Sequence, residues 1–282
     1  MGRTENINVF QDTMNLCKNN DRIRESIHNS AEGQKLILEG DAIVEPDKNR
    51  YKEKARITVS AKRTFEAASG YKNTKTAVHN FASASNPGGG VERGANAQEE
   101  CLCRCSGLFK CLNAPDAWSG FYMAHREEHN PIHNDDIIYT PDVLVFKSDT
   151  VKPELMDEAD WYTVDVITCA APNLREKPSN AFNTGDGKDA IKITDKDLLA
   201  IHEKRLLRIL DVALSNKVET IVLGAFGCGA FMNNPNVVAL ASKNVVNEYL
   251  YAFKNIEFAV YCSPKDDTNY RIFDGVLKPY TK

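Results

Sequence analysis

Three consecutive glycines and a pair of adjacent carboxylates are the residues of this chain best suited to chemistry. The glycines are followed, after a short spacer, by a glutamine and the two acids: Gly88, Gly89, Gly90, Gln98, Glu99 and Glu100. Because glycine has no side chain, a ligand can approach the backbone N–H groups of such a run directly. Backbone N–H groups attract anions, and carboxylic acids transfer protons. The pattern therefore predicts an anionic ligand with bond-breaking chemistry next to it.

A second glycine-rich segment, residues 224–231, follows an apolar run. Its residues that could contact a ligand are Gly227, Cys228, Gly229, Ala230 and Phe231. Successive N–H groups in such a turn can form an anion-binding nest, although a structural turn is the commoner role of one such segment alone. Cys228 itself is expected to be a small packing residue, since no histidine stands near it in sequence. Together with the acid pair, the two glycine segments indicate a site that encloses a diphosphate from both sides.

The acid pair also has structural interpretations. Asn96 and Glu99 have the spacing of a helix N-cap followed by an acid at the third helical position, which would use Glu99 in a capping box. No such role is predicted for Glu100. The helix dipole lowers the pKa of a carboxyl group in the first turn, whereas burial beside a second glutamate raises it. Only a buried, crowded site would leave one of the two acids protonated near neutral pH.

Short β-branched runs alternate with helical patterns along the chain. We expect strands at residues 56–60, 76–81, 143–146, 164–169, 220–223 and 258–262. We expect helices at residues 98–112, 195–215 and 236–253, where apolar side chains recur at helical spacing. Strands that alternate with helices predict an α/β layered fold whose ligand-binding loops leave the strand ends.

The N-terminal part of the chain is more polar than the rest. Residues 1–50 have only scattered apolar positions, and we expect a helical N-terminal extension that ends near Glu45, Pro46 and Asp47. Residues 51–282 would then form the main domain. Within it, residues 177–189 are predicted to form a surface loop.

The composition is ordinary for a globular protein, with 42% hydrophobic and 26% charged residues. Lys and Arg number 35 against 39 Asp and Glu, a formal net charge of −4, so we expect no direct binding of duplex nucleic acid. No apolar run reaches the ~18 to 20 residues that a membrane helix needs, and the first residues do not resemble a signal peptide. We therefore expect no membrane partner, a cytoplasmic location and reduced thiols at the eight cysteines.

Two further patterns could belong to metal sites. Residues 125–129 fit the His-x-x-Glu-His pattern of some zinc peptidases, but Pro131 follows closely, and a solvated polar turn is the preferred interpretation. Cys101, Cys103 and Cys105 are close in sequence, yet on a helix Cys103 points away from the other two, so buried packing is preferred. We therefore predict neither a metal nor a cofactor.

The three glycines, followed at this spacing by Gln-Glu-Glu, resemble the signature of poly(ADP-ribose) glycohydrolases, and residues 101–109 and 224–231 resemble the short bacterial-type members. The resemblance implies a three-layer α/β/α macrodomain-like fold with a mixed central sheet, in which residues 51–282 form the catalytic domain. It also implies hydrolysis of ribose–ribose O-glycosidic bonds in poly(ADP-ribose), mainly from chain ends, with ADP-ribose as the product. The partner would be the polymer or an ADP-ribosylated protein.

The same resemblance implies roles for individual residues. Glu100 would be the catalytic acid, and Glu99 would orient the ribose. Asn86 would bind the distal ribose, and Phe231 would pack on the sugar. The full set of implied substrate-binding residues is Asn86, Gly88, Gly89, Gly90, Val91, Gln98, Gly227, Cys228, Gly229, Ala230 and Phe231.

Two other functions would use the same cleft. One is a macrodomain that binds terminal ADP-ribose without cutting it, and the other is a hydrolase that removes single ADP-ribose units from protein or nucleic acid. The retained acid pair favours an enzyme over a pure binding module, because a binding module needs no acid beside the anomeric carbon.

Overall fold

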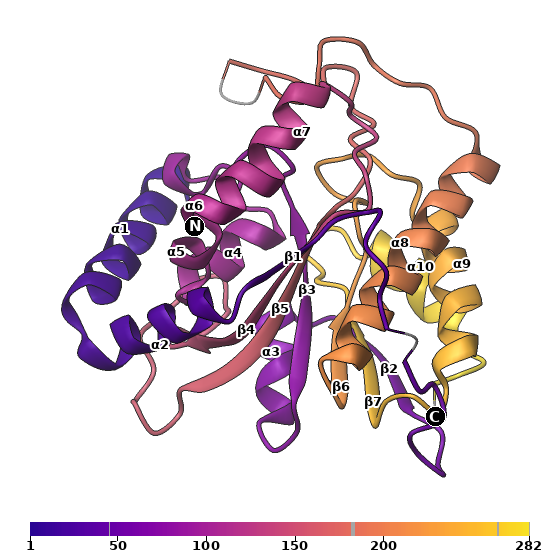
Figure 1. Cartoon of the computed structure of the whole chain (residues 1–282), viewed down its shortest axis with the longest axis horizontal. Helices are drawn as coiled ribbons and strands as arrows, with labels where there is room; N and C mark the ends of the chain where they lie inside the picture. The colour runs from indigo at the N-terminus through magenta and orange to yellow at the C-terminus, as the bar shows by residue number, and fades with distance from the viewer. Residues whose placement is uncertain (45, 182–183, 264, 282) are drawn as a thin grey trace.

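The computed structural model describes residues 1–44, 46–181, 184–263 and 265–281. Within these residues the strands form one seven-stranded sheet in the order β1-β4-β5-β3-β6-β7-β2 (Figure 1). The strands are β1 (Lys35–Ile37), β2 (Arg56–Ser60), β3 (Thr76–Ala82), β4 (Ile137–Val145), β5 (Tyr162–Ala170), β6 (Thr220–Leu223) and β7 (Asn255–Ala259). Strand β4 runs antiparallel to both of its neighbours, β1 and β5. The other neighbouring strands are parallel, so the sheet is mixed, as predicted.

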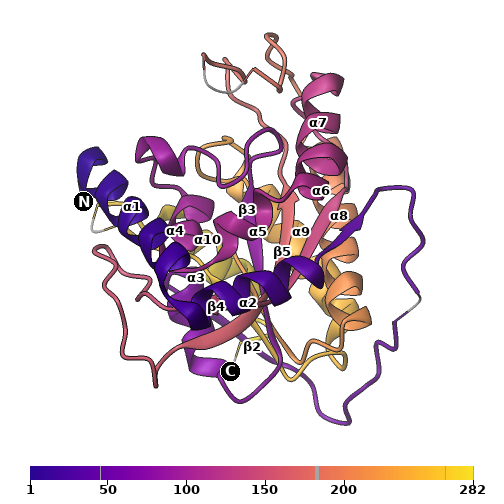
Figure 2. The same ribbon diagram turned by 60° about the vertical axis from the view of Figure 1, so that its left-hand side comes forward.

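Helices cover both faces of this sheet (Figures 1 and 2). The helices are α1 (Arg3–Asn19), α2 (Asp21–Glu32), α3 (Thr64–Ala68), α4 (Gln98–Cys105), α5 (Leu108–Leu112), α6 (Pro115–Ala117), α7 (Met123–Glu128), α8 (Asp195–Ser215), α9 (Pro235–Val246) and α10 (Thr268–Leu277). Helices α8, α9 and α10 pack on one face, and α2 to α5 pack on the other. This is the three-layer α/β/α arrangement that the sequence predicted.

The strand sequences explain how one sheet holds two cores. In β3, Ala77 belongs to the core shared with α8, α9 and α10, whereas the next residue, Val78, belongs to the core shared with α3 and α4. Ile221 and Val222 of β6 divide in the same way. Successive side chains of a strand point to opposite faces, so a strand covered on both sides is apolar throughout. The central strands were predictable from the sequence for this reason.

The register of β3 and β6 brings the two glycine segments together. The strands are parallel neighbours, with Val78 opposite Val222. The chain therefore leaves both strands at the same edge of the sheet, which is where ligand sites of such sheets lie. We call residues 86–94, which follow β3, glycine loop 1, and residues 224–233, which follow β6, glycine loop 2.

The N-terminal segment is helical, as predicted, and it also supplies an edge strand. Helix α2 begins after Asn20, whose side chain accepts a hydrogen bond from the N–H of Ile23 at 3.1 Å, a regular N-cap. Strand β1 was not predicted, because three residues are too few to show a period. The predicted break at residues 45–47 includes Glu45, which lies outside the described residues. Among the helices that the structure describes, none is long and apolar enough to cross a membrane.

The predicted helix at residues 98–112 is wrong in its middle. Helix α4 ends at Cys105 and α5 begins at Leu108. The hydroxyl of Ser106 donates to the carbonyl of Leu102 at 2.8 Å and accepts from the N–H of Leu108 at 3.2 Å. A serine side chain that bonds the backbone in this way competes with the helical hydrogen bonds and interrupts the helix. The helical spacing of apolar residues continues across this interruption, so the sequence does not reveal it.

Three other predicted boundaries also differ. Strand β4 begins before the predicted 143–146 because it continues through an irregularity at Pro141 and Asp142, where the register shifts. A proline inside a run hides a strand from sequence reasoning. The helix predicted at 236–253 ends at Val246, and a short 3₁₀ turn follows it. The strand predicted at 258–262 ends at Ala259, which frees the next residues to line the sheet edge.

Candidate active site

The two glycine loops border a cavity of about 1050 Å³ at this edge of the sheet. The predicted site residues that line it are Asn86, Gly89, Gly90, Gln98, Glu99, Glu100, Gly227, Gly229, Ala230 and Phe231. Gly88, Val91 and Cys228 were also predicted to contact substrate, but they are not among the lining residues. The volume is at the upper end of the roughly 300 to 1,000 Å³ typical of small-molecule sites. The cavity therefore has room for a ligand as large as a dinucleotide.

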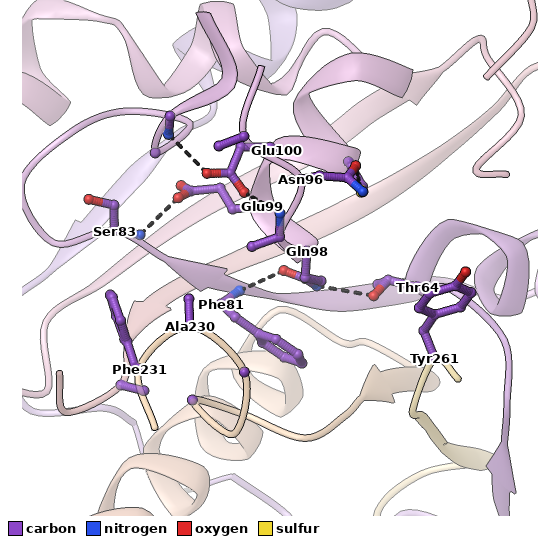
Figure 3. A pocket seen from close by; sticks show the side chains of 18 of the residues that line it. Thr64, Phe81, Ser83, Asn96, Gln98, Glu99, Glu100, Ala230, Phe231 and Tyr261 are labelled. Atoms are coloured by element: carbon purple, nitrogen blue, oxygen red, sulfur yellow. Dashed lines mark hydrogen bonds between the residues drawn. The ribbon is translucent and has the colours of Figure 1, made fainter. Parts of the chain in front are cut away.

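Gln98, the first residue of α4, fastens that helix to the end of β3. Its Oε1 accepts a hydrogen bond from the N–H of Phe81 at 2.9 Å (Figure 3). Its Nε2 donates to the carbonyl of His79 at 2.8 Å and to the hydroxyl of Thr64 at 3.1 Å. Because these contacts fix the first turn of α4, they also fix where the next two side chains start.

Glu99 is buried at the cavity wall, with 3% of its surface exposed. Its Oε2 accepts from the N–H of Ser83 at 2.8 Å (Figure 3). Its Oε1 accepts from Nδ2 of Asn80 at 3.3 Å. Burial raises the pKa of Glu99 well above its ordinary value, and the neighbouring Glu100 raises it further, whereas the hydrogen bonds lower it. Glu99 therefore keeps its proton to higher pH than an exposed glutamate does.

Glu100, not Glu99, occupies the capping position of α4. The N-cap residue is Ala97, so Glu100 is the third helical residue, and its Oε2 accepts from the N–H of Ala97 at 2.9 Å. Its Oε1 accepts from the N–H of Gly90 at 2.9 Å (Figure 3). The prediction of a capping box with Asn96 and Glu99 is wrong because the N-cap residue is Ala97, not Asn96.

The two carboxyl groups converge, although successive helix residues point about 100° apart. A Cβ atom added to Gly89 would lie 2.6 Å from Oε1 of Glu100 and 3.1 Å from Oε2 of Glu99. These two oxygens are therefore less than 6 Å apart, and any side chain at position 89 would displace them. The glycine is required here because both carboxyl groups approach the backbone closely.

The N–H groups of glycine loop 1 already have partners within the protein. The N–H of Gly89 donates to a backbone carbonyl at 3.0 Å, and that of Gly90 donates to Glu100 at 2.9 Å. A hydrogen bond from the N–H of Gly88 helps to lower the pKa of Glu99. This differs from the expectation of a bare loop whose N–H groups face a ligand. The acceptors of the N–H groups of loop 1 thus include the protein's own glutamates, Glu99 and Glu100.

Glycine loop 2 has the opposite character. The N–H groups of Gly229, Ala230 and Phe231 donate to no acceptor among the described residues. Gly229 and Ala230 are exposed, and a Cβ atom added to Gly229 would meet nothing within 4 Å. Successive open N–H groups are the feature that binds an anion such as a phosphate.

The side chain of Asn233 fixes the conformation of loop 2 by hydrogen bonds to its backbone carbonyls. Its Nδ2 donates to the carbonyls of Gly227 and Phe231, each at 3.1 Å, and its Oδ1 pairs with the buried ring of His202 at 2.8 Å. Gly227 has a φ of +76°, and a Cβ atom there would lie 2.7 Å from Cβ of Ala171. The open N–H groups therefore belong to a loop with a defined conformation.

Asn86 is held by Arg126, a contact that the sequence did not predict. The Nη2 of Arg126 donates to Oδ1 of Asn86 at 2.6 Å, and its Nε donates to the carbonyl of Ser85 at 2.7 Å. The guanidinium group lies 5.1 Å from the centre of the Trp118 ring. Helix α7 thus orients the amide that was predicted to bind ribose.

The predicted solvated turn at residues 125–129 is therefore wrong. Most of it lies in α7, and His125 is buried against the ring of Phe121, with the ring centres 4.5 Å apart. The aromatic residues just before the motif supply the apolar partner that the motif itself lacks. Within the described ranges, no group of three or more His, Cys, Asp or Glu side chains could hold a metal ion. Cys101, Cys103 and Cys105 are buried, in line with the predicted packing role.

Other lining residues were missed by sequence reasoning. Asp149 is 5% exposed, and its Oδ1 has no hydrogen-bond partner, with Nη1 of Arg63 3.9 Å away. Burial raises the pKa of Asp149 to about 6. The half-exposed ring of Tyr261 lies 4.1 Å from the guanidinium carbon of Arg63. Tyr261 stands just after β7, so the rule that sites gather at strand ends could have found it if the end of β7 had been predicted correctly.

Comparison with known proteins decides the family. Residues 4–148 match the model of the microbial-type PARG catalytic domain. The chain belongs to this family. PARG stands for poly(ADP-ribose) glycohydrolase, so the family is one of glycosidases. No curated protein sequence matches the chain.

Solved structures of bacterial members of the PARG family have the same fold. The enzyme from Thermomonospora curvata is 26% identical, with a TM-score of 0.81 over 97% of this chain and 100% of that chain. Its complex with the inhibitor ADP-HPD is also 26% identical, with a TM-score of 0.78 over 97% and 99% of the two chains. The enzyme from Deinococcus radiodurans in complex with ADP-ribose is 29% identical, with a TM-score of 0.73 over 90% and 97%. The predicted family and macrodomain-like fold are confirmed.

Proposed function

We propose that this protein hydrolyses the ribose–ribose O-glycosidic bonds of poly(ADP-ribose), mainly from chain ends, and releases ADP-ribose. The observation that carries the proposal is the convergence of Glu99 and Glu100 on Gly89 at the wall of a cavity whose other wall, glycine loop 2, offers open N–H groups. An acid pair opposite a phosphate-binding loop suits a substrate in which a diphosphate is attached to a reacting sugar. The cavity volume of about 1050 Å³ suits one terminal unit rather than several, which favours cleavage at chain ends.

The diphosphate of the terminal unit is assigned to glycine loop 2. The N–H groups of Gly229, Ala230 and Phe231 would donate to its oxygens. Arg175 lines the cavity with its guanidinium carbon 5.5 Å from the centre of the Phe231 ring, and it adds a positive charge on this side. The Phe231 ring would pack on the distal ribose, and the oriented amide of Asn86 would bind a ribose hydroxyl.

Glu100 is assigned the proton transfers. It protonates the oxygen that leaves C1″ of the terminal ribose while positive charge develops on the sugar. The bound diphosphate stabilises that charge electrostatically. Ionised Glu100 then takes a proton from the water that attacks C1″, which restores the starting protonation state and gives ADP-ribose.

Glu99 is assigned the orientation of the ribose and a share in holding the proton. Its pKa is raised by burial and by Glu100, so the pair retains a proton that an exposed pair would lose. Neutralising one member also avoids placing two negative charges beside the diphosphate.

The adenosine part of the unit is assigned to the region of Tyr261 and Asp149. Tyr261 and Phe231 lie at opposite sides of the view in Figure 3, with the end of β3 between them. The ring of Tyr261 offers a surface for a base to stack on. The unpartnered Oδ1 of buried Asp149 needs a donor, such as an exocyclic amino group, for its hydrogen bond.

Incubation of the purified protein with automodified polymer, followed by product identification, tests the proposal. Free ADP-ribose released from polymer supports it, whereas tight binding without release indicates a binding module. Release from mono-ADP-ribosylated protein but not from polymer indicates the other hydrolase.

The variant Glu100→Gln tests the assignment of the acid. It should lower kcat by at least about 100-fold, because general acid–base catalysis contributes that much, while ADP-ribose still binds. Near-normal turnover in this variant would contradict the role of Glu100.

A further inference from the structure

Two arginines line the cavity beside the acid pair, and the assignment of the terminal unit leaves them unused. They are Arg3, at the start of α1, and Arg93, at the end of the 3₁₀ turn in glycine loop 1. The Nε of Arg3 donates a hydrogen bond to the backbone carbonyl of Arg93 at 2.6 Å. The side chain of Arg3 therefore lies beside the backbone of Arg93. Arg3 is exposed and pairs with no acidic side chain among the described residues.

The N-terminus of α1 is seated firmly on loop 1. Gly94 has a φ of +73°, and a Cβ atom added to it would lie 2.3 Å from the carbonyl oxygen of Arg3. The buried side chain of Asn6 donates to the carbonyl of Gly94 at 3.1 Å. Helix α1 and the turn that carries Arg93 are thus in direct backbone contact, which fixes the start of both arginine side chains.

The Arg93 guanidinium lies close to the catalytic carboxylate. Nη2 of Arg93 is 3.9 Å, and Oε1 of Glu100 is 3.7 Å, from the point where a Cβ atom of Gly90 would stand. The two groups are therefore less than 8 Å apart. Arg93 is therefore near enough to Glu100 to contact a substrate that is bound at this carboxyl group.

The arginines also lie on the side away from the diphosphate loop. In Figure 1, α4 lies between α1 and the strand β6 that leads into glycine loop 2. If the terminal unit binds between α4 and loop 2, the group that leaves C1″ departs toward α1 and loop 1. In the polymer, that group is the 2′ oxygen of the next unit's adenosine ribose.

We propose that Arg3 and Arg93 form a subsite for the diphosphate of the unit that leaves, and the proposal rests on the function proposed above. Six covalent bonds of about 1.5 Å separate that 2′ oxygen from the first phosphorus atom, so the phosphate lies at most about 8 Å from the cleaved bond. Arg93 lies less than 8 Å from Oε1 of Glu100, so its guanidinium group is within reach of this phosphate. Guanidinium groups bind phosphate oxygens through paired hydrogen bonds. An N-terminal helix thereby gives the enzyme a preference for polymer over a leaving group without phosphate.

The test compares two substrates with the same terminal unit. One is poly(ADP-ribose), and the other is ADP-ribose joined at C1″ to a neutral aryl alcohol. Arg3→Gln, Arg93→Gln and the double variant are measured beside the wild type. Lys18→Gln is the matched control, since Lys18 is an exposed cation on the same helix, about 22 Å further along.

The expected result is a loss of kcat/KM on polymer of about three- to tenfold for each arginine, with a clearly smaller loss on the aryl substrate. The slope of log kcat/KM on polymer against log salt should become shallower by about 0.7 for each arginine removed. Lys18→Gln should leave both substrates and the slope unchanged.

Two results would overturn the proposal. Equal losses on both substrates would show that the arginines only support the catalytic centre, and no loss on polymer would show that they do not contact the leaving unit. Failure of the wild type to cut polymer would instead refute the proposed function itself, so the two failures are distinguishable.

Discussion

The two glycine loops look alike in sequence and differ in what their backbone does. Each follows a central strand, and each carries three glycines close together. In loop 1 the N–H groups of Gly89 and Gly90 have protein partners, one of them Glu100. In loop 2 the N–H groups of Gly229, Ala230 and Phe231 are open. The same composition therefore serves to hold the protein's own acids in one loop and to receive a ligand's anion in the other.

The difference follows from what stands opposite each loop. Loop 1 faces the first turn of α4, where two carboxyl groups approach it within the space of a missing side chain. Loop 2 faces the cavity, and Asn233 fixes it from the other side. A glycine-rich run thus signals close approach to the backbone, and the approaching group is known only once the neighbours are placed.

The largest expected effect is a loss of kcat when a side chain is added in loop 1. In Gly89→Ala the new Cβ would stand 2.6 Å from Oε1 of Glu100 and would displace both carboxyl groups. A shift of about 1 Å in a catalytic group costs on the order of 100-fold, so kcat should fall by that factor. The affinity for ADP-ribose, measured by calorimetry, should change much less. A variant that loses affinity but keeps kcat would reverse the roles of the two loops.

A smaller effect is expected from loop 2, and it should appear in binding. Gly227→Ala places a side chain in the left-handed region and 2.7 Å from Cβ of Ala171, so the loop must shift. We expect the Kd for ADP-ribose to rise about tenfold, corresponding to roughly 1.4 kcal/mol. Gly229→Ala is the matched variant in the same loop, and its Cβ has free space, so its Kd should change less than threefold. Equal effects of the two variants would contradict the account of loop 2.

The smallest expected effect is on the stability of the fold, because burying Glu99 beside Glu100 makes the free energy of unfolding depend on pH. The pKa of Glu99 is raised in the folded state above the ordinary value of 4.5, so the unfolded chain loses this proton first as the pH rises. The stability that protonated Glu99 contributes is present below about pH 4.5 and is lost as the pH rises through the folded-state pKa. Glutamine does not titrate, so the variant Glu99→Gln does not lose this stability as the pH rises. Relative to wild type, its free energy of unfolding should therefore rise as the pH increases above about 4.5. Denaturant unfolding at several pH values measures it, and a difference independent of pH would count against the assignment.

The sequence predicted the elements whose apolar residues recur at a regular spacing. The strands β2, β3 and β6 and the helix α8 were predictable because their apolar spacing reflects burial on a sheet face or a helix stripe. The edge strand β1 was missed because three residues are too few to show a period. The end of α4 at Ser106 was missed because the hydrogen bond of the serine side chain does not change the spacing of apolar residues. The division at residue 50 and the cytoplasmic location remain predictions.

The site itself was only partly visible in the sequence. Glu99 and Glu100 were identified by motif, but which of them caps α4 depends on where the helix begins, and boundaries are poorly encoded. Asp149, Arg126 and Arg3 come from distant parts of the chain and carry no local pattern. Only the folded sheet brings them to the cavity or to the residues that line it.

The most direct test of the division between the loops is a crystal structure of the Glu100→Gln variant with ADP-ribose. We predict C1″ within about 4 Å of the side chain at position 100, close enough for proton transfer, and the diphosphate on the N–H groups of Gly229, Ala230 and Phe231. A diphosphate bound to Gly88 and Gly89 of loop 1, or a side chain at position 100 turned to bulk solvent, would contradict it.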